Sequence, residues 1–428
     1  MSRFFIDLGP LRRFPYFRML WTGYAVRQLG AQLTTTTVIY QIFVLTHSNL
    51  DVGLLSLVQL GPSLLFPIVG GAIADAVDRR KLLAVMAVLL ALCPLGLALN
   101  STGGHPALWV IFVLSGASSG FAGIDGPTRT AVTMNLVDRE SIVGANVLRS
   151  LLADISSIAG PGIAGVLIAL FHGRVAQVYW IDVGSTAIAL QAVVRLPPLL
   201  PGSGGRKFSL NSIAEGFRYI QSRQVIQGCF VADIIATTLG EPVSLFPYMA
   251  LMHFHGGAMA FGLLSAGPAI GAGLGGLVSG WTGRVRRQGR AVLVAVAIWG
   301  AAIVLFGFAP WLWLGIIAIA LAGWADATSV VFRSTILQLE VPDRLRGRLS
   351  SIETAVVTSA PRLGNAEGGL VAAVSSAPIA IYTGGLACIV GIAIMAKLMP
   401  RFATYDIASA TGLDKPPSTD SEGGSSEA

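Results

Sequence analysis

Charged residues are scarce in this sequence, and their scarcity excludes an ordinary soluble protein. Asp, Glu, Lys and Arg together make up 12% of the 428 residues, whereas a soluble domain carries about a quarter. Apolar residues fill the deficit and account for 54% of the chain. The sequence therefore predicts a membrane protein.

Cysteine is also rare, and its positions exclude a disulfide framework. Cys93, Cys229 and Cys388 lie far apart, each within an apolar run. Disulfide-rich folds and zinc sites need loop cysteines or closely spaced cysteines. We therefore expect three small buried hydrophobic residues and no metal site.

Catalytic motifs are missing as well, so the sequence does not predict an enzyme or a bound cofactor. No nucleophile–base spacing, metal cluster or phosphate loop is present. Gly271, Gly273 and Gly276 have the spacing of a dinucleotide-binding loop, but they lie inside an apolar run and not after a strand. We assign them to helix packing.

Long apolar runs dominate the chain. A run of about twenty residues crosses a bilayer core of about 30 Å as a helix. These runs predict an all-α polytopic membrane protein with about twelve transmembrane helices, six in each half. The expected spans are 17–45, 52–74, 82–99, 107–134, 141–171, 176–196, 225–252, 261–281, 291–309, 311–339, 350–375 and 377–399. The first run has no small-residue cleavage site and is predicted to be retained.

The composition between and after the runs predicts four regions. Residues 1–196 form an N-terminal six-helix bundle, and residues 224–400 form a C-terminal one. Residues 197–223 are a cytoplasmic linker with an amphipathic surface helix at 209–221. Residues 401–428, rich in Ser, Gly, Pro and acids, are expected to be a disordered cytoplasmic tail.

Lysine and arginine gather in alternate loops. They occur in the N-terminal segment, in the turns near Arg79, Arg139, Arg286 and Arg346, and in the central loop, whereas the opposite loops hold only Arg174. By the positive-inside rule both termini are cytoplasmic in a multi-pass protein of the cell (inner) membrane. The net charge of +7 therefore reflects topology, and we expect no nucleic-acid partner.

The turn with the sequence GGAIADAVDRRK at 70–81 has a counterpart in the second half. The halves repeat at an offset of roughly 205 residues, an internal symmetry typical of transporters. Gly71 and its turn match Gly276 and TGRVRR at 282–287, and Arg129 matches Arg333. The segment 160–165 likewise matches 361–369.

With these landmarks the chain resembles the major facilitator superfamily of transporters. The family's loop motif, Gly-x-Leu-Ala-Asp-Arg-x-Gly-Arg-Lys/Arg, is matched at 71–80 except for Ala76 and Asp78, and Gly280 replaces the acid in the second copy. Within the superfamily the chain resembles the bacterial enterobactin exporter group. That likeness rests on Phe17-Arg18, on THS at 46–48 with VGL at 52–54, on EGFR at 215–218 and on Gly347-Arg348. The resemblance implies the major facilitator fold of two pseudo-symmetric six-helix bundles.

The resemblance also implies a cytoplasmic gate. In the family the motif acid docks against the start of helix eleven and an arginine of helix four. Ser350 and Glu353 have the spacing of a capping box at that expected helix start. The alternative is that Asp75 caps its own turn. Carried over, the gate residues are Gly71, Asp75, Arg79, Arg80, Arg129, Ser350 and Glu353.

A Gly-Pro motif in the fifth span resembles one associated with proton-coupled exporters. Gly160, Pro161 and Gly165 are predicted to kink this helix. Alternatively, they form a packing notch that carries no information on direction.

Ionisable residues within the spans are the candidate transport residues. An uncompensated charge at mid-bilayer costs at least about 2.5–3.5 kcal/mol, so such residues face a partner or a water-filled path. Alternatively, each deep acid forms a fixed ion pair with one of two deep arginines. The predicted cavity and proton-coupling residues are Arg27, Asp154, Asp233, Glu241, Asp326, Arg362 and Glu367.

Other intramembrane charges have structural interpretations that compete with solute contact. Arg129, Arg149 and Arg333 are near enough to the cytoplasmic face to snorkel, and Asp182 is near enough to an external loop to cap it. Among the deep acids we favour Asp233 and Glu241, because they share one helix with two prolines.

The predicted function is secondary active transport, with proton-coupled efflux of a small drug-like or siderophore-like solute by alternating access. Its partners would be the solute, protons and the bilayer, with the proton gradient as energy source, and the protein would act as a monomer. The alternatives are an importer or a lysolipid flippase on the same scaffold, and a non-transporting membrane sensor or scaffold.

Overall fold

The computed structural model describes residues 8–197, 210–277 and 279–407, without the side chains of residues 71, 72, 74–76 and 210–213. Within these ranges the chain is helical and contains no β-strand. In chain order the elements are α1 (Gly9–Arg13), α2 (Pro15–Thr46), α3 (Asn49–Ala76), α4 (Arg79–Thr102), α5 (Leu108–Leu136), α6 (Ile142–Leu170), α7 (Val175–Val194), α8 (Leu210–Ser222), α9 (Gln224–Leu239), η1 (Val243–Leu245), α10 (Phe246–Tyr248), η2 (Met249–His253), α11 (Gly257–Leu277), η3 (Ser279–Arg284), α12 (Gln288–Gly307), α13 (Leu312–Glu340), α14 (Asp343–Val374), α15 (Ala377–Leu398) and α16 (Pro400–Ala403).

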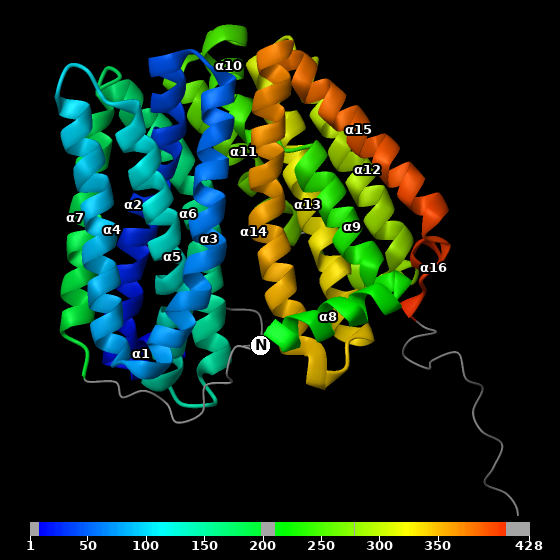
Figure 1. Cartoon of the computed structure of the whole chain (residues 1–428), viewed down its shortest axis with the longest axis horizontal. Coiled ribbons are helices and arrows are strands. Elements are labelled where there is room, and N and C mark those ends of the chain that lie inside the picture. Colours follow the sequence, from blue (N-terminus) through cyan, green and yellow to red (C-terminus); the bar gives the residue numbers. More distant parts are fainter. Residues whose placement is uncertain (1–7, 198–209, 278, 408–428) are drawn as a thin grey trace, which may run out of the picture.

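The long helices form two groups, α2–α7 on one side and α9 with α11–α15 on the other (Figure 1). Among the described residues, nine helical segments are long and apolar enough to cross a membrane. The other long helices, α2, α7 and α14, have similar lengths but more polar residues. The all-α polytopic class predicted from the sequence is confirmed. Residues 198–209 and 408–428 lie outside the described ranges, so the boundaries of the linker and tail stay predictions.

Two predicted spans differ in detail from the structure. The span expected at 225–252 matches the candidate membrane span Gln224–His253. Its α-helix is interrupted after Leu239, because Pro242 has no N–H to donate to the carbonyl of Thr238. The span expected to begin at Ser350 begins at Asp343, directly after Pro342. Its first turns are charged, and a search for apolar runs therefore starts this helix too late.

The basic turns lie at one end of both groups, which we call the basic end. There Asp78 is the N-cap of α4 and accepts a hydrogen bond from the backbone N–H of Arg80 (2.9 Å). Asp138, in the turn after α5, accepts one from the N–H of Ser141 (2.9 Å). Hydrogen bonds from Ser141 hold the pKa of Asp138 below its ordinary value.

The helix α8 lies across the basic end of the second group, below α9 and α14 (Figure 1). Glu215 pairs with Arg348 of α14, and Ile220 is buried against Leu345 and Leu349. Phe217 on the same helix stays 54% exposed. A helix thus occupies the segment predicted at 209–221, and it is anchored on the first turns of α14.

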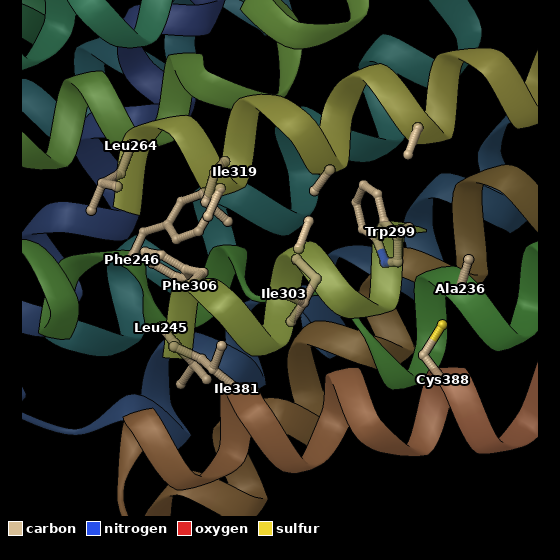
Figure 2. Close-up of a cluster of buried hydrophobic side chains, with 14 of the residues drawn as sticks. Ala236, Leu245, Phe246, Leu264, Trp299, Ile303, Phe306, Ile319, Ile381 and Cys388 are labelled. Atoms are coloured by element: carbon tan, nitrogen blue, oxygen red, sulfur yellow. The ribbon is translucent and has the colours of Figure 1, made fainter. Parts of the chain in front are cut away.

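The core of the second group is continuous and combines aliphatic with aromatic side chains. Figure 2 shows Phe246 of α10 beside Phe306 of α12, with Ile303 and then Trp299 farther along α12. The rings of Phe246 and Phe306 meet edge to face, with centroids 5.7 Å apart. Cys388 lies in the same cluster, and Cys93 and Cys229 are buried too, as their sequence positions predict.

Small residues set the closest helix contacts. A Cβ on Gly271 of α11 would come within 1.7 Å of the Ala320 carbonyl oxygen of α13, and one on Gly323 within 1.9 Å of the Pro268 carbonyl oxygen. Only glycine allows the two backbones to approach this closely. Gly271 of the pattern at 271–276 is therefore a packing position, as predicted, whereas Gly276 has open space around it.

The two groups meet mainly at the end opposite the basic turns. Gly53 near the start of α3 packs on Gly369 near the end of α14, and Gly165 of α6 packs on Gly262 of α11. Tyr40 of α2 lies against Phe261 of α11, with ring centroids 5.7 Å apart. Towards the basic end α3 and α14 diverge (Figure 1).

Candidate functional site

A buried charge cluster joins α2 and α5 in the first group. Asp125 accepts hydrogen bonds from Arg27 (2.9 Å) and from the Nη2 and Nε atoms of Arg129 (2.8 and 3.2 Å). The exposed fractions are 7% for Arg27, 1% for Asp125 and 3% for Arg129. Tyr24 lies over both guanidinium groups, with its ring centroid 5.5 Å from Arg27 and 5.0 Å from Arg129. The first-group cluster is therefore enclosed and carries two cations and one anion.

A second cluster lies at the equivalent place in the second group. Arg333 of α13 pairs with Asp233 of α9 and, more loosely, with Asp326 (3.9 Å). Arg27 and Asp233 are 206 positions apart and Arg129 and Arg333 are 204 apart, so both pairs match the repeat. The charge order is inverted, with two anions around one cation. The side chain of Asp326 is 40% exposed, so the second-group cluster is open on one side.

These clusters overturn several alternatives that the sequence allowed. Arg129 and Arg333 do not snorkel, because both are buried in ion pairs. Arg149 is half-buried and donates a hydrogen bond to the hydroxyl of Thr130. Asp182 does not cap a loop. It lies inside α7 and accepts hydrogen bonds from Thr34 (2.7 Å) and Ser185 (2.9 Å).

Glu241 occupies the break that follows α9. Gly240 and Pro242 flank it, and the chain resumes as η1 at Val243. A Cβ on Gly364 of α14 would lie 3.0 Å from the Glu241 Cβ atom, so the acid packs directly on α14. Glu241 is half-buried and has no hydrogen bond or ion pair within the described part of the chain. It differs in this respect from Asp233 on the same span.

Arg362 links the two groups near the middle of the membrane helices. From α14 it donates hydrogen bonds to the hydroxyls of Ser63 on α3 and Ser119 on α5 (3.0 Å to Ser119). The ion pairs considered for the deep acids, with Arg27 or Arg362 as the cation, are therefore not formed. Arg27 pairs with Asp125, and Arg362 binds hydroxyl groups.

The two remaining predicted acids have no partner among the described residues. Asp154 is exposed on α6, and Glu367 is half-buried on α14. Neither lies in the charge cluster of its own group.

The predicted gate is only partly visible. The side chains of Gly71 and Asp75 lie outside the described part of the chain, so the proposed latch stays a prediction. Arg80 donates a hydrogen bond to the carbonyl oxygen of Val194, and Arg79 is half-buried. Arg129 belongs to the first-group cluster, where it binds Asp125.

The capping box predicted at Ser350 and Glu353 is wrong. Both residues lie inside α14, two turns after its start at Asp343, and Ser350 is exposed. The amide of an interior helical residue is engaged in the helix and is not a free donor. Any anion that docks at this helix start would meet the amides that follow Pro342.

The Gly-Pro motif of α6 lies in close helix contacts. A Cβ on Gly160 would lie 2.4 Å from the Cβ of Gln32 in α2, and one on Gly165 would lie 2.6 Å from the Ala258 carbonyl oxygen. The helix runs without a break through Pro161. These contacts agree with the packing interpretation, and the association with export stays a prediction.

Several polar residues of the site were not singled out from the sequence. Tyr24, Ser63 and Ser119 contact the buried arginines, yet Ser and Tyr are common within apolar spans and give no distinctive pattern. Asp125 was visible as an intramembrane acid one helical turn before Arg129, and that i, i+4 spacing is the signal that indicates the pair. No group of three or more potential metal ligands occurs among the described residues.

The comparisons with known proteins agree with this architecture. The chain is 31% identical over 395 residues to the enterobactin exporter EntS of Citrobacter koseri, covering 92% of this chain and 94% of the relative. It is 29% identical, with the same coverage, to EntS of Shigella boydii. The crystal structure of the nucleoside transporter NupG is similar in fold, with a TM-score of 0.70 at 13% identity over 90% of this chain and 98% of that one.

The family assignment follows from a match over nearly the whole chain. The profile of the family described as transmembrane secretion effector matches residues 6–422. The relatives and the fold neighbours are transporters and not enzymes. The protein is thus a multi-pass membrane protein and a secondary transporter of small molecules. It belongs to the transmembrane secretion effector family of the major facilitator superfamily.

Proposed function

We propose that this transporter exports a siderophore-like organic solute in exchange for protons, by alternating access and as a monomer. The basic end faces the cytoplasm in this proposal, so both termini are cytoplasmic in the inner membrane. The contacts between the groups lie at the opposite end, which corresponds to a conformation that is closed outside and open inside. The similarity to proteins named enterobactin exporters supports the direction and the class of solute.

The observation that carries proton coupling is the environment of Glu241. The acid lies at a helix break, packed on α14, and has no cation or hydrogen-bond donor within the described residues. A carboxylate enclosed by apolar helices without a counter-ion is costly, so such a group takes up a proton when enclosed and releases it when water reaches it. Rocking of the two groups would alternate these two conditions.

Asp233 is the weaker candidate for coupling. Its carboxylate already has a counter-ion in Arg333, so protonation would leave a buried guanidinium without that partner. Loss of one partner of a buried ion pair is strongly destabilising, whereas protonation of Glu241 leaves no cation without its partner. The two acids of this span therefore have different proposed roles.

Transport of enterobactin into proteoliposomes with an imposed pH gradient tests the proposal. Wild-type protein should accumulate the probe, and a protonophore should abolish the accumulation. Glu241→Gln should reduce accumulation to the protonophore-treated level while enterobactin exchange without a gradient persists. Gln keeps the shape of the side chain and cannot carry the proton.

Asp343→Asn is the control, because Asp343 is an exposed acid at the basic end that pairs with Arg346 and is not a candidate coupling residue. It should retain gradient-driven accumulation. Accumulation by Glu241→Gln at the wild-type level would refute the coupling role. If the wild-type protein transports no enterobactin in either direction, the proposed solute class is wrong.

A further inference from the structure

An apolar groove of about 320 Å³ lies on the second group near its basic end, between η3, α12 and α13. Its walls include Val294 and Ile298 of α12 and Trp324 and Phe332 of α13. Trp281 of η3 meets the ring of Phe332 edge to face, at 6.0 Å between centroids. Val294 is 50% exposed, so the groove opens on the outer surface of this group.

Two arginines border this apolar groove. Arg287 precedes the first turn of α12 and Arg290 lies within it, and both are exposed. Neither forms an ion pair within the described ranges, and no described residue that lines the groove is acidic. The N-terminus of α12 adds the positive end of a helix dipole beside them.

Arg287 ends the second copy of the loop motif and Arg290 follows three residues later, and this copy differs from the first. In the first half Arg80 donates to the carbonyl of Val194, and Asp78 caps the helix that begins with the basic residues. In the second half Gly280 replaces the motif acid, and Arg287 and Arg290 border an apolar surface instead. The second copy thus offers unpaired cations where a hydrocarbon-lined groove begins.

Along α12 the groove is about as long as one membrane leaflet is thick. From Arg287 to Ile298 the helix advances eleven residues, or about 16 Å at 1.5 Å per residue. Half of a bilayer core is about 15 Å. A soluble anion would use the arginines but leave the apolar walls without a partner, whereas an anionic lipid would use both.

We propose that this groove binds an anionic glycerophospholipid from the leaflet at the basic end. The phosphodiester group would bind Arg287 and Arg290, and one acyl chain would lie against Val294, Ile298 and Trp324. Basic pockets between transmembrane helices on the cytoplasmic side bind anionic headgroups by this combination of charge and apolar contact. The inference rests on the membrane-spanning fold and does not depend on export or proton coupling.

Native mass spectrometry of the detergent-solubilised full chain tests the proposal, with phosphatidylglycerol and phosphatidylcholine of identical acyl chains as probes. Wild-type protein should prefer phosphatidylglycerol. Each basic residue beside an anionic lipid surface contributes about fivefold to binding, so Arg287→Gln with Arg290→Gln should weaken phosphatidylglycerol binding about thirtyfold. Replacing both arginines by Lys should preserve most of the preference.

Arg284→Gln is the matched control, because this exposed arginine lies in the same basic segment but does not line the groove. It should bind phosphatidylglycerol as the wild type does. Val294→Trp, which fills the groove and leaves the arginines in place, should weaken binding of both lipids. Equal binding of the two lipids by wild type, an equal loss in Arg284→Gln, or full competition by inorganic phosphate would each overturn the proposal.

Discussion

Replacing Asp125 by Asn should destabilise the protein more than any surface charge change. The carboxylate is 1% exposed and accepts three hydrogen bonds, at 2.8, 2.9 and 3.2 Å, from two buried guanidinium groups. Asn keeps the volume but offers one neutral oxygen to two cations. Removing one partner of a buried ion pair costs about 3–5 kcal/mol, and here a single change leaves two cations without their anion. We expect a loss at or above the upper end of that range.

Unfolding by SDS in mixed micelles, followed by circular dichroism, measures this loss. Asp343→Asn is the control, because Asp343 forms an exposed i, i+3 pair with Arg346 (2.9 Å). Exposed pairs contribute little to stability, so this variant should unfold with the wild type. If Asp125→Asn also unfolds at the wild-type SDS fraction, the first-group cluster does not stabilise the fold and the reasoning fails.

Three other outcomes can be measured with the same material. Gly271→Ala should lower the free energy of unfolding by about 1–3 kcal/mol, because its Cβ would overlap the Ala320 carbonyl oxygen, whereas Gly276→Ala, with open space around it, should not. Asp233→Arg and Arg333→Asp should each reduce the yield of folded protein, and the double exchange should restore part of it if the two residues pair as observed. Arg362→Gln should weaken the link to Ser63 and Ser119 and broaden the distance distribution between spin labels at the exposed positions 150 and 351, and an unchanged distribution would count against that link.

The sequence was sufficient to predict the helices because a bilayer selects for length and apolarity. Length and apolarity failed to predict a helix boundary where polar or helix-breaking residues determine it. The first turns of α14, from Asp343 to Arg348, are charged, and Arg348 pairs there with Glu215 of α8. The helix start was therefore predicted seven residues late. The break at Glu241 was missed because the run around it is otherwise apolar, and a search for apolar runs passes over Gly240 and Pro242.

Most charged residues of the site could be predicted from the sequence, but the ion pairs that they form could not. An intramembrane charge is visible in the sequence because its cost is high, and this is why Arg27, Asp233 and Arg333 could be recognised. The pairing of these charges depends on contacts between helices, and the sequence of one span does not reveal those contacts. Asp125 lies 98 residues from Arg27 in the chain, and the hydroxyls that bind Arg362 lie in two other helices. The repeat was the one long-range signal, since it predicted that Arg129 and Arg333 would occupy equivalent places.

The inverted charge order of the two clusters indicates that the halves of this transporter are not mechanically equivalent. In the first group both cations are held by one enclosed anion and covered by Tyr24, so the helices α2 and α5 are fixed to each other. In the second group one cation serves two anions, and the outer anion, Asp326, is 40% exposed and only loosely paired. The interrupted helix and the unpaired Glu241 belong to this same group. A change of protonation in the second group would alter the charge around Arg333, whose pairing with Asp326 is loose. In the first-group cluster the one acid, Asp125, is paired with both arginines. Under the proposed proton coupling, we expect the rearrangement to begin in the second group, with the first group moving as a rigid body.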